Sequence, residues 1–207
     1  VRRTCYLRKL KKNNNYSACI SLLESSNISN ILSGNKYCKT IISIHNVMVS
    51  KEAKLLYRIS AYPLINLLYR HADKIITVSK EIEAQLVQKL KAPKEKTATI
   101  VNGCDCLKIQ EQIEKLPQNK KGYEYFMNKN HKIVVCVGRI DVQKGQWHLI
   151  RAFSEVVKKE PKAMLFLIGI GALEDYLKEL IQKYNLEKNI IMLGFCDNPF
   201  WYNAHAD

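Results

Sequence analysis

Two cations that follow an apolar run suggest a site for a negatively charged group. Residues 134–137 are apolar and β-favouring, the run ends at Gly138-Arg139, and Lys144 follows five residues after the arginine. Gly138 lets the backbone turn sharply at the end of the expected strand, and a helix is expected directly after the lysine. Because the carboxyl end of a parallel strand and the start of a helix both favour anions, Arg139 and Lys144 suit a diphosphate. Surface ion pairs with Asp141 or Glu174 are the alternative explanation of these two cations.

Three further positions have residue types that suit a binding site. His45 ends another expected strand and precedes Asn46, a turn residue, although a lone histidine is more often a hydrogen-bonded structural residue. Gly169-x-Gly171 follows a third apolar run, but it lacks the third glycine of the dinucleotide fingerprint, so a tight turn before a helix explains it equally well. Glu24 opens a polar turn for which a capping turn is the plainer explanation.

Alternating strands and helices position these residues, and the alternation predicts an α/β fold with parallel sheets. Polar, Lys-rich sequence over 107–130 interrupts the pattern and predicts a domain organisation of 1–106, a connection over 107–130, and 131–207. The expected strands are 17–23, 40–44, 74–78, 97–101, 132–138, 163–169 and 189–195, and the expected helices are 4–12, 51–71 with a break at Pro63, 80–90 capped by Ser79, 146–159 and 172–184.

Composition places the chain among ordinary soluble globular proteins. It has 207 residues, of which 47% are hydrophobic and 25% charged, and no apolar run approaches the roughly 20 residues that span a bilayer. The seven cysteines are scattered and odd in number, which indicates reduced thiols in the cytosol. Cys104-x-Cys106 has the wrong spacing for a zinc site, so no metal is expected.

The net charge of +14 is concentrated in the first half of the chain. Residues 1–108 have 19 Lys and Arg against 7 Asp and Glu, which gives +12, whereas residues 109–207 have 14 against 12, which gives +2. An anionic membrane surface, a nucleic acid or a simply solvated basic face would each explain this asymmetry. Three tyrosines lie among basic residues over 51–70, as is typical of a membrane interface, although tyrosine and leucine at helical spacing are more often part of the core. Nucleic acid is not expected because no nucleic-acid-binding motif is present.

Several sequence motifs together resemble a known family. They are TIISIHN at 40–46, ADKIITVS at 72–79, VNGCD at 101–105, VGR at 137–139 with KG at 144–145, LIGIG at 167–171 and LGF at 193–195. On these motifs the chain resembles the group 1 glycosyltransferases, also called glycosyltransferase family 4. The resemblance implies a GT-B architecture: two doubly wound, Rossmann-like parallel-sheet domains that face each other across a cleft.

The resemblance also implies a function and roles for single residues. It implies retaining, metal-independent transfer from a UDP- or GDP-linked sugar to a lipid-linked or polysaccharide acceptor sugar, in cell-envelope or capsule synthesis. A cytoplasmic location, peripheral on the inner face of the plasma membrane, follows from the same resemblance. The implied residues are His45, Arg139 and Lys144 in catalysis, Gly138, Arg139, Lys144, Gly169 and Gly171 in donor binding, and Glu24 and Asn46 on the acceptor side.

Two pieces of the family pattern are missing from the sequence. Neither the glycine-rich loop after a first strand nor the later motif of two glutamates separated by seven residues is present, so the chain is expected to be truncated at both ends. A catalytically incomplete nucleotide-binding module, or a basic protein that binds nucleic acid, are the alternative functions.

Overall fold

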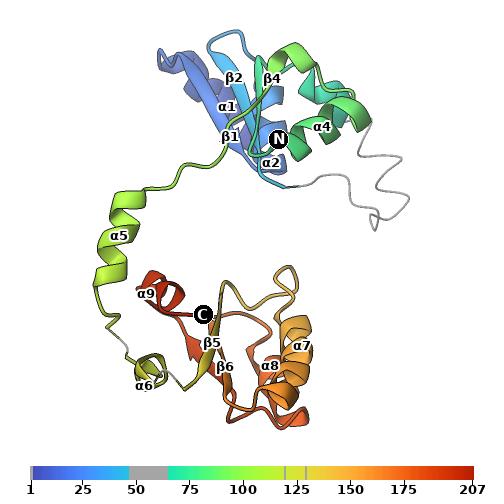
Figure 1. Cartoon of the computed structure of the whole chain (residues 1–207). Helices are drawn as coiled ribbons and strands as arrows, with labels where there is room; N and C mark the ends of the chain where they lie inside the picture. Colours follow the sequence, from blue (N-terminus) through green and yellow to red (C-terminus); the bar gives the residue numbers. More distant parts are fainter. Residues whose placement is uncertain (1, 47–64, 119, 129) are drawn as a thin grey trace. The chain divides into compact units, whose positions relative to one another are not determined.

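The protein divides into two compact α/β units, each built around one parallel sheet (Figure 1). The computed structural model describes residues 2–46, 65–118, 120–128 and 130–207. Unit 1 spans Val1–Gly103 and unit 2 spans Cys104–Asp207. All strand pairings are parallel and the strands are connected through helices, which confirms the predicted fold class.

The sheet of unit 1 has four strands in the order β1-β2-β3-β4. Its core is mostly aliphatic, and Ile42 of β2 and Ile75 of β3 are fully buried in it. Most of the helix predicted over 51–71 lies outside the described residues, and its last part is helical at 65–69. The elements are α1 Arg2–Asn13, β1 Ala18–Leu22, α2 Glu24–Leu32, β2 Lys39–Ile44, β3 Lys74–Thr77, α4 Lys80–Lys89, the 3-10 turn η1 Lys94–Lys96 and β4 Thr97–Thr99.

Helix α2 replaces the polar turn that was predicted after the first strand. It begins at Glu24, and its buried positions include Asn27 and Asn30 as well as Ile31. Asparagine and serine are poor helix formers, so the sequence has little local signal for a helix here. By contrast, the cap predicted for α4 is confirmed, because Oγ of Ser79 accepts a hydrogen bond from the backbone N–H of Ile82 at 3.3 Å.

The sheet of unit 2 has three strands in the order β5-β6-β7. All six residues of the central strand β6 are buried, as expected for a strand covered on both faces. The elements are α5 Cys106–Glu114, α6 Tyr123–Met127, β5 Lys132–Val137, α7 Gln146–Lys159, β6 Ala163–Ile168, α8 Glu174–Lys183, β7 Ile190–Gly194 and α9 Pro199–Ala204.

Two separate hydrophobic clusters cover the two faces of this sheet. Figure 1 shows the helices that contribute to them, α7 and α8 on one side of the strands and α6 and α9 on the other. On one face, Leu165 and Leu167 of β6 pack against apolar residues of α7 and α8. On the other face, Phe166 lies in a cluster with Trp201 of α9, and Phe126 of α6 packs against that cluster. The alternation of side chains along β6 therefore serves both layers of helices.

The segment predicted as a connection over 107–130 is part of unit 2. The side chain of Asn198 holds the C-terminal end of α5 by donating to the carbonyls of Gln112 and Lys115, at 2.7 and 2.6 Å. The hydroxyl of Tyr202 donates to the carbonyl of Lys121 at 3.1 Å. The polar composition of this segment reflects exposed faces of α5 and α6, while their other contacts tie them to α9. Within the described residues, no helix is long and apolar enough to cross a membrane.

Candidate functional site

The predicted donor residues of unit 2 meet where β5 and β6 end. The backbone N–H of Gly138 donates to the carbonyl of Ile168 at 2.9 Å, and the N–H of Ile140 donates to that of Ile170 at 3.1 Å. These bonds extend the pairing of the two strands into the loops that follow them. The two loops predicted from separate motifs therefore form one continuous surface at the carboxyl edge of the sheet.

Glycine is required in the second loop because the two backbones nearly touch. A Cβ atom on Gly169 would lie 2.0 Å from the carbonyl oxygen of Gly138, and one on Gly171 would lie 2.1 Å from that of Ile140. Gly169 also has a φ of 141°, which other residues rarely adopt. The Gly169-x-Gly171 pattern is thus explained by close approach of one loop to the other.

Asp141 organises the loop that holds both cations. Its Oδ1 accepts from the backbone N–H groups of Gln143 and Lys144, at 2.9 and 3.2 Å. Its Oδ2 lies 3.2 Å from Nη2 of Arg139, so the ion pair considered as an alternative from the sequence does form. The guanidinium side chain remains 73% exposed, and an ion pair this exposed contributes little energy and leaves the arginine able to reach a ligand.

The side chain of Lys144 lies across the end of β5. A Cβ atom on Gly138 would be 3.7 Å from Cε of Lys144. Burial raises the pKa of the Cys136 thiol in β5, and the nearby Lys144 ammonium partly offsets that rise. Glu174, the other proposed ion-pair partner, instead accepts a 2.7 Å hydrogen bond from the backbone N–H of Gly171. Within the described residues no ion pair joins it to Arg139 or Lys144.

Helix α7 begins directly beside these cations. Gly145 precedes it with a left-handed φ of 64°, and no side chain caps this end. The first turn of α7 therefore adds its partial positive charge to those of Arg139 and Lys144. Gln146, which the sequence analysis missed, is 3% exposed and donates from Nε2 to the carbonyl of Arg139 at 2.8 Å. Its position immediately after Lys144-Gly145 was the signal in the sequence that could have identified Gln146 as part of the site.

The predicted residues of unit 1 lie at the carboxyl edge of its own sheet. His45 follows β2 and is half-buried, with Nε2 3.0 Å from Oγ of Ser43, and Asn46 beside it is exposed. Glu24 follows β1, but it forms the first turn of α2 instead of a polar turn. Leu23, between the end of β1 and Glu24, has φ 69° and ψ 150°, a strained conformation for a residue with a side chain. The structure thus groups the predicted residues at one sheet edge in each unit.

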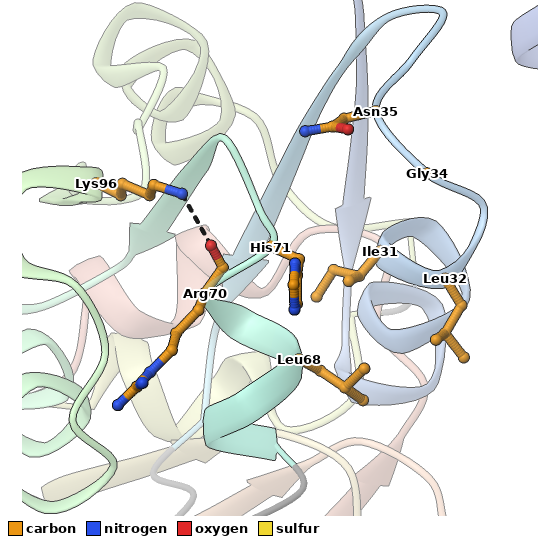
Figure 2. A pocket seen from close by; sticks show the side chains of 8 residues that line it. All are labelled: Ile31, Leu32, Gly34, Asn35, Leu68, Arg70, His71 and Lys96. Atoms are coloured by element: carbon orange, nitrogen blue, oxygen red, sulfur yellow. Dashed lines mark hydrogen bonds between the residues drawn. The ribbon is translucent and has the colours of Figure 1, made fainter.

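The opposite edge of the unit 1 sheet has a pocket of about 480 Å³ (Figure 2). Arg70 and Lys96, which line the pocket, precede β3 and β4, so the pocket lies at the amino ends of the strands. It is therefore separate from the carboxyl edge, where His45 lies. Lys96 is already engaged, because its Nζ donates to the carbonyls of Arg70 and Ala72 at 2.8 and 3.1 Å. The pocket is lined by Ile31, Leu32, Gly34, Asn35, Leu68, Arg70, His71 and Lys96.

Comparison with known families accounts for both units. Residues 117–204 match the model of the group 1 glycosyl transferases. Residues 3–107, half of the chain, match the model of glycosyltransferase family 4. The chain belongs to glycosyltransferase family 4.

Curated relatives of this family 4 chain are longer than the chain itself. An uncharacterized glycosyltransferase of Methanocaldococcus jannaschii is 31% identical over 190 residues, which cover 92% of this chain and 46% of that protein. A second relative, from Campylobacter jejuni, is 35% identical over 144 residues, or 70% of this chain and 36% of that protein. It is an N-acetylgalactosamine-N,N'-diacetylbacillosaminyl-diphospho-undecaprenol 4-alpha-N-acetylgalactosaminyltransferase. The chain thus spans about half the length, or less, of these relatives.

Solved structures show the same fold. Anabaena HepE in complex with UDP matches 99% of this chain and 54% of that one, with a TM-score of 0.77 and 19% identity. The complex of HepE with UDP-glucose gives a TM-score of 0.74 at 20% identity, over 97% of this chain and 54% of that one. These likenesses confirm the GT-B fold class that the sequence motifs predicted.

Proposed function

We propose that this family 4 chain is the part of a retaining glycosyltransferase that brings together the donor phosphates and the reacting sugar. In the reaction, the bond between the anomeric carbon and the phosphate oxygen breaks. A nucleoside diphosphate leaves with the electron pair, and an acceptor hydroxyl forms the new glycosidic bond as its proton passes to an oxygen of the departing diphosphate. The surface around Arg139 and Lys144 is the observation that supports the proposal most strongly.

That surface suits a leaving diphosphate. Arg139 offers a planar fork of N–H donors and Lys144 a point charge, while the first turn of α7 adds backbone N–H groups. Positive groups fixed in advance stabilise charge that develops on a leaving group, because they need no reorganisation during the step. In this proposal the two side chains do the work that a metal ion does in other transferases, and no metal is needed.

His45 is proposed to act on the sugar from the edge of unit 1. It is half-buried at the end of β2, and Glu24 and Asn46 at the same edge are proposed to face the acceptor. A hydrogen bond from the imidazole to a sugar hydroxyl or to a phosphate oxygen would orient the donor. We propose no general-base role for it.

The relatives suggest the class of donor and acceptor. HepE has been solved with UDP and with UDP-glucose, which supports a UDP-linked donor, with a GDP-linked sugar as the alternative. The Campylobacter relative is named for a diphospho-undecaprenol substrate, and a Bacillus subtilis relative is a poly(glycerol-phosphate) alpha-glucosyltransferase. We therefore propose a lipid-linked or polysaccharide acceptor sugar in envelope or capsule synthesis.

A peripheral position on the inner face of the plasma membrane is part of the same proposal. Helix α1 is basic, and its exposed residues include Arg2, Arg3 and Lys9. Such a surface would attract anionic lipid and so bring the acceptor site to a lipid-linked sugar. The tyrosine-rich segment at 51–70 lies mostly outside the described residues.

Calorimetric titration of the chain with UDP tests the donor site. Arg139→Ala and Lys144→Ala should each weaken binding about 10- to 100-fold, because a hydrogen bond to a charged group contributes about 1.5–3 kcal/mol. Lys159→Ala is the matched control, since it removes an exposed cation from the far end of the same helix. Equal affinity of all three variants and the wild type would reject the proposal. A turnover assay then measures release of UDP from UDP-glucose by a protein that contains both units, in the presence of an acceptor. UDP binding without such release would favour the alternative of a nucleotide-binding module.

A further inference from the structure

A chain of buried polar side chains connects α2 to the end of β2. Nδ2 of Asn30 donates to Oγ of Ser21 at 3.0 Å, and that hydroxyl donates to Oδ1 of Asn27 at 2.8 Å. Nδ2 of Asn27 then donates to the carbonyl of Ser43 at 3.0 Å. All four residues are at most 9% exposed. Apolar residues are usual where a helix packs on a sheet, and these hydrogen bonds offset the cost of burying polar groups here, although Oδ1 of Asn30 has no partner among the described residues.

The last member of this network contacts the proposed catalytic histidine. Ser43 and His45 are two residues apart on β2 and its end, so their side chains lie on the same face of the sheet. Oγ of Ser43 lies 3.0 Å from Nε2 of His45. Among the described residues, the Ser43 hydroxyl has no other hydrogen-bond partner, and none is recorded for Nδ1 of His45.

The burial of Ser43 decides which group donates in this bond. If Nε2–H of His45 were the donor, the proton of the Ser43 hydroxyl would be buried without an acceptor, which is unfavourable. If the hydroxyl donates to Nε2, the proton of the buried serine has its acceptor, and the proton of the neutral imidazole must then be on Nδ1 of the half-buried ring.

We propose that Ser43 is a positioning residue that holds His45 in the Nδ1–H tautomer, with Asn27 fixing Ser43 from behind. This inference rests on the proposed function, which places His45 beside the reacting sugar. The histidine then offers an N–H donor to a sugar or phosphate oxygen through Nδ1, while its lone pair is engaged by Ser43. A ring fixed in this way orients a substrate oxygen and does not accept a proton from it through Nδ1.

Nitrogen NMR of the histidine side chains in the whole chain tests the proposal without any substrate. Long-range ¹H–¹⁵N spectra are recorded above the imidazole pKa of about 6.5, and His45→Gln assigns the signal of His45 among the five histidines. The wild type should show His45 mainly as the Nδ1–H tautomer. Ser43→Ala should reverse the majority to Nε2–H, whereas Ser43→Thr, which keeps the hydroxyl, should retain Nδ1–H.

Ser33→Ala is the matched control. Ser33 is 2% exposed and donates from Oγ to the carbonyl of Asn30 at 2.6 Å, but it does not contact His45. This variant should keep the wild-type tautomer. An Nε2–H wild type would overturn the proposal even if Ser43→Ala fails to fold, and so would a Ser43→Ala variant that keeps Nδ1–H. UDP binding is measured separately, so its absence would reject the proposed function and leave the tautomer result unaffected.

Discussion

The two units hold their candidate residues by different means. In unit 2 the main constraint is backbone approach: the loops at 138–140 and 169–171 lie so close that only glycine fits at Gly169 and Gly171, and the side chains of Asp141 and Gln146 add hydrogen bonds to the first loop. In unit 1, side chains do so, through the network that runs from Asn30 to Ser43. A backbone contact leaves no room for an added atom, whereas a side-chain network depends on every donor having its acceptor. The carboxyl edge of the sheet is therefore sensitive to added atoms in unit 2 and to the loss of a polar group in unit 1.

Adding one methyl group to unit 2 should have the largest effect. Gly169→Ala places a Cβ atom against the carbonyl oxygen of Gly138, and we expect the free energy of unfolding of unit 2 to fall by about 3 kcal/mol. Both tryptophans, Trp147 and Trp201, lie in unit 2, so fluorescence during urea unfolding reports this unit. Lys159→Ala, which removes an exposed side chain of unit 2, should change the transition by about 0.5 kcal/mol or less. Equal effects of the two substitutions would contradict the close approach of the loops.

Removing one amide from unit 1 should have the next largest effect. Asn27→Ala leaves the Ser21 hydroxyl without its acceptor in a buried position, and we expect a loss of about 2 kcal/mol in the unfolding of unit 1. Far-UV circular dichroism should show the loss while the tryptophan transition stays unchanged. Asn14→Ala is the control, because its 2.9 Å bond to the carbonyl of Leu10 is exposed. A shift of the tryptophan transition in Asn27→Ala would show that the edges of the two units are not stabilised independently.

The smallest expected effect is a pH dependence of unit 1 alone. Lys11 is 2% exposed, and burial lowers the pKa of its ammonium below the ordinary 10.5, although Cys19, Cys38 and Asp73 oppose the shift. Between the folded-state pKa and 10.5, the unfolded chain binds more protons than the folded one, so stability rises with pH. The wild type should therefore gain stability relative to Lys11→Met as the pH approaches 10.5. A difference that is constant with pH, or one that appears in unit 2, would contradict this.

The strand ends could be predicted from the sequence because they depend on local patterns. Apolar runs followed by glycine or histidine marked the ends of β2, β5 and β6, and the candidate residues do lie there. The positions of Gly169 and Gly171 could be predicted, but the reason why glycine is required there could not. That reason is the close approach of the backbone of a loop about thirty residues earlier in the chain.

What the sequence did not reveal depends on contacts between distant residues. Helix α2 has serines and asparagines, and its buried asparagines are stabilised by partners on β1 and β2. The boundary at 103/104 differs from the predicted connection at 107–130, because the C-terminal end of α5 is held by Asn198, more than eighty residues away. Ser43 was overlooked although its spacing from His45 was visible, because only burial gives that spacing a meaning.

The complete burial of β6 has a consequence for the synthesis and refolding of the protein. The strand is AMLFLI, six uncharged residues without proline, and its two neighbours lie far along the chain on either side. Parallel pairing of this kind forms late, because each pair must wait for a long crossover to close. Until then the hexapeptide is the type of segment that assembles with copies of itself. Slow refolding at high protein concentration should therefore yield aggregates that start from β6. A single lysine in that strand would prevent this aggregation, but it would also disrupt the hydrophobic core of unit 2, because every residue of β6 is buried.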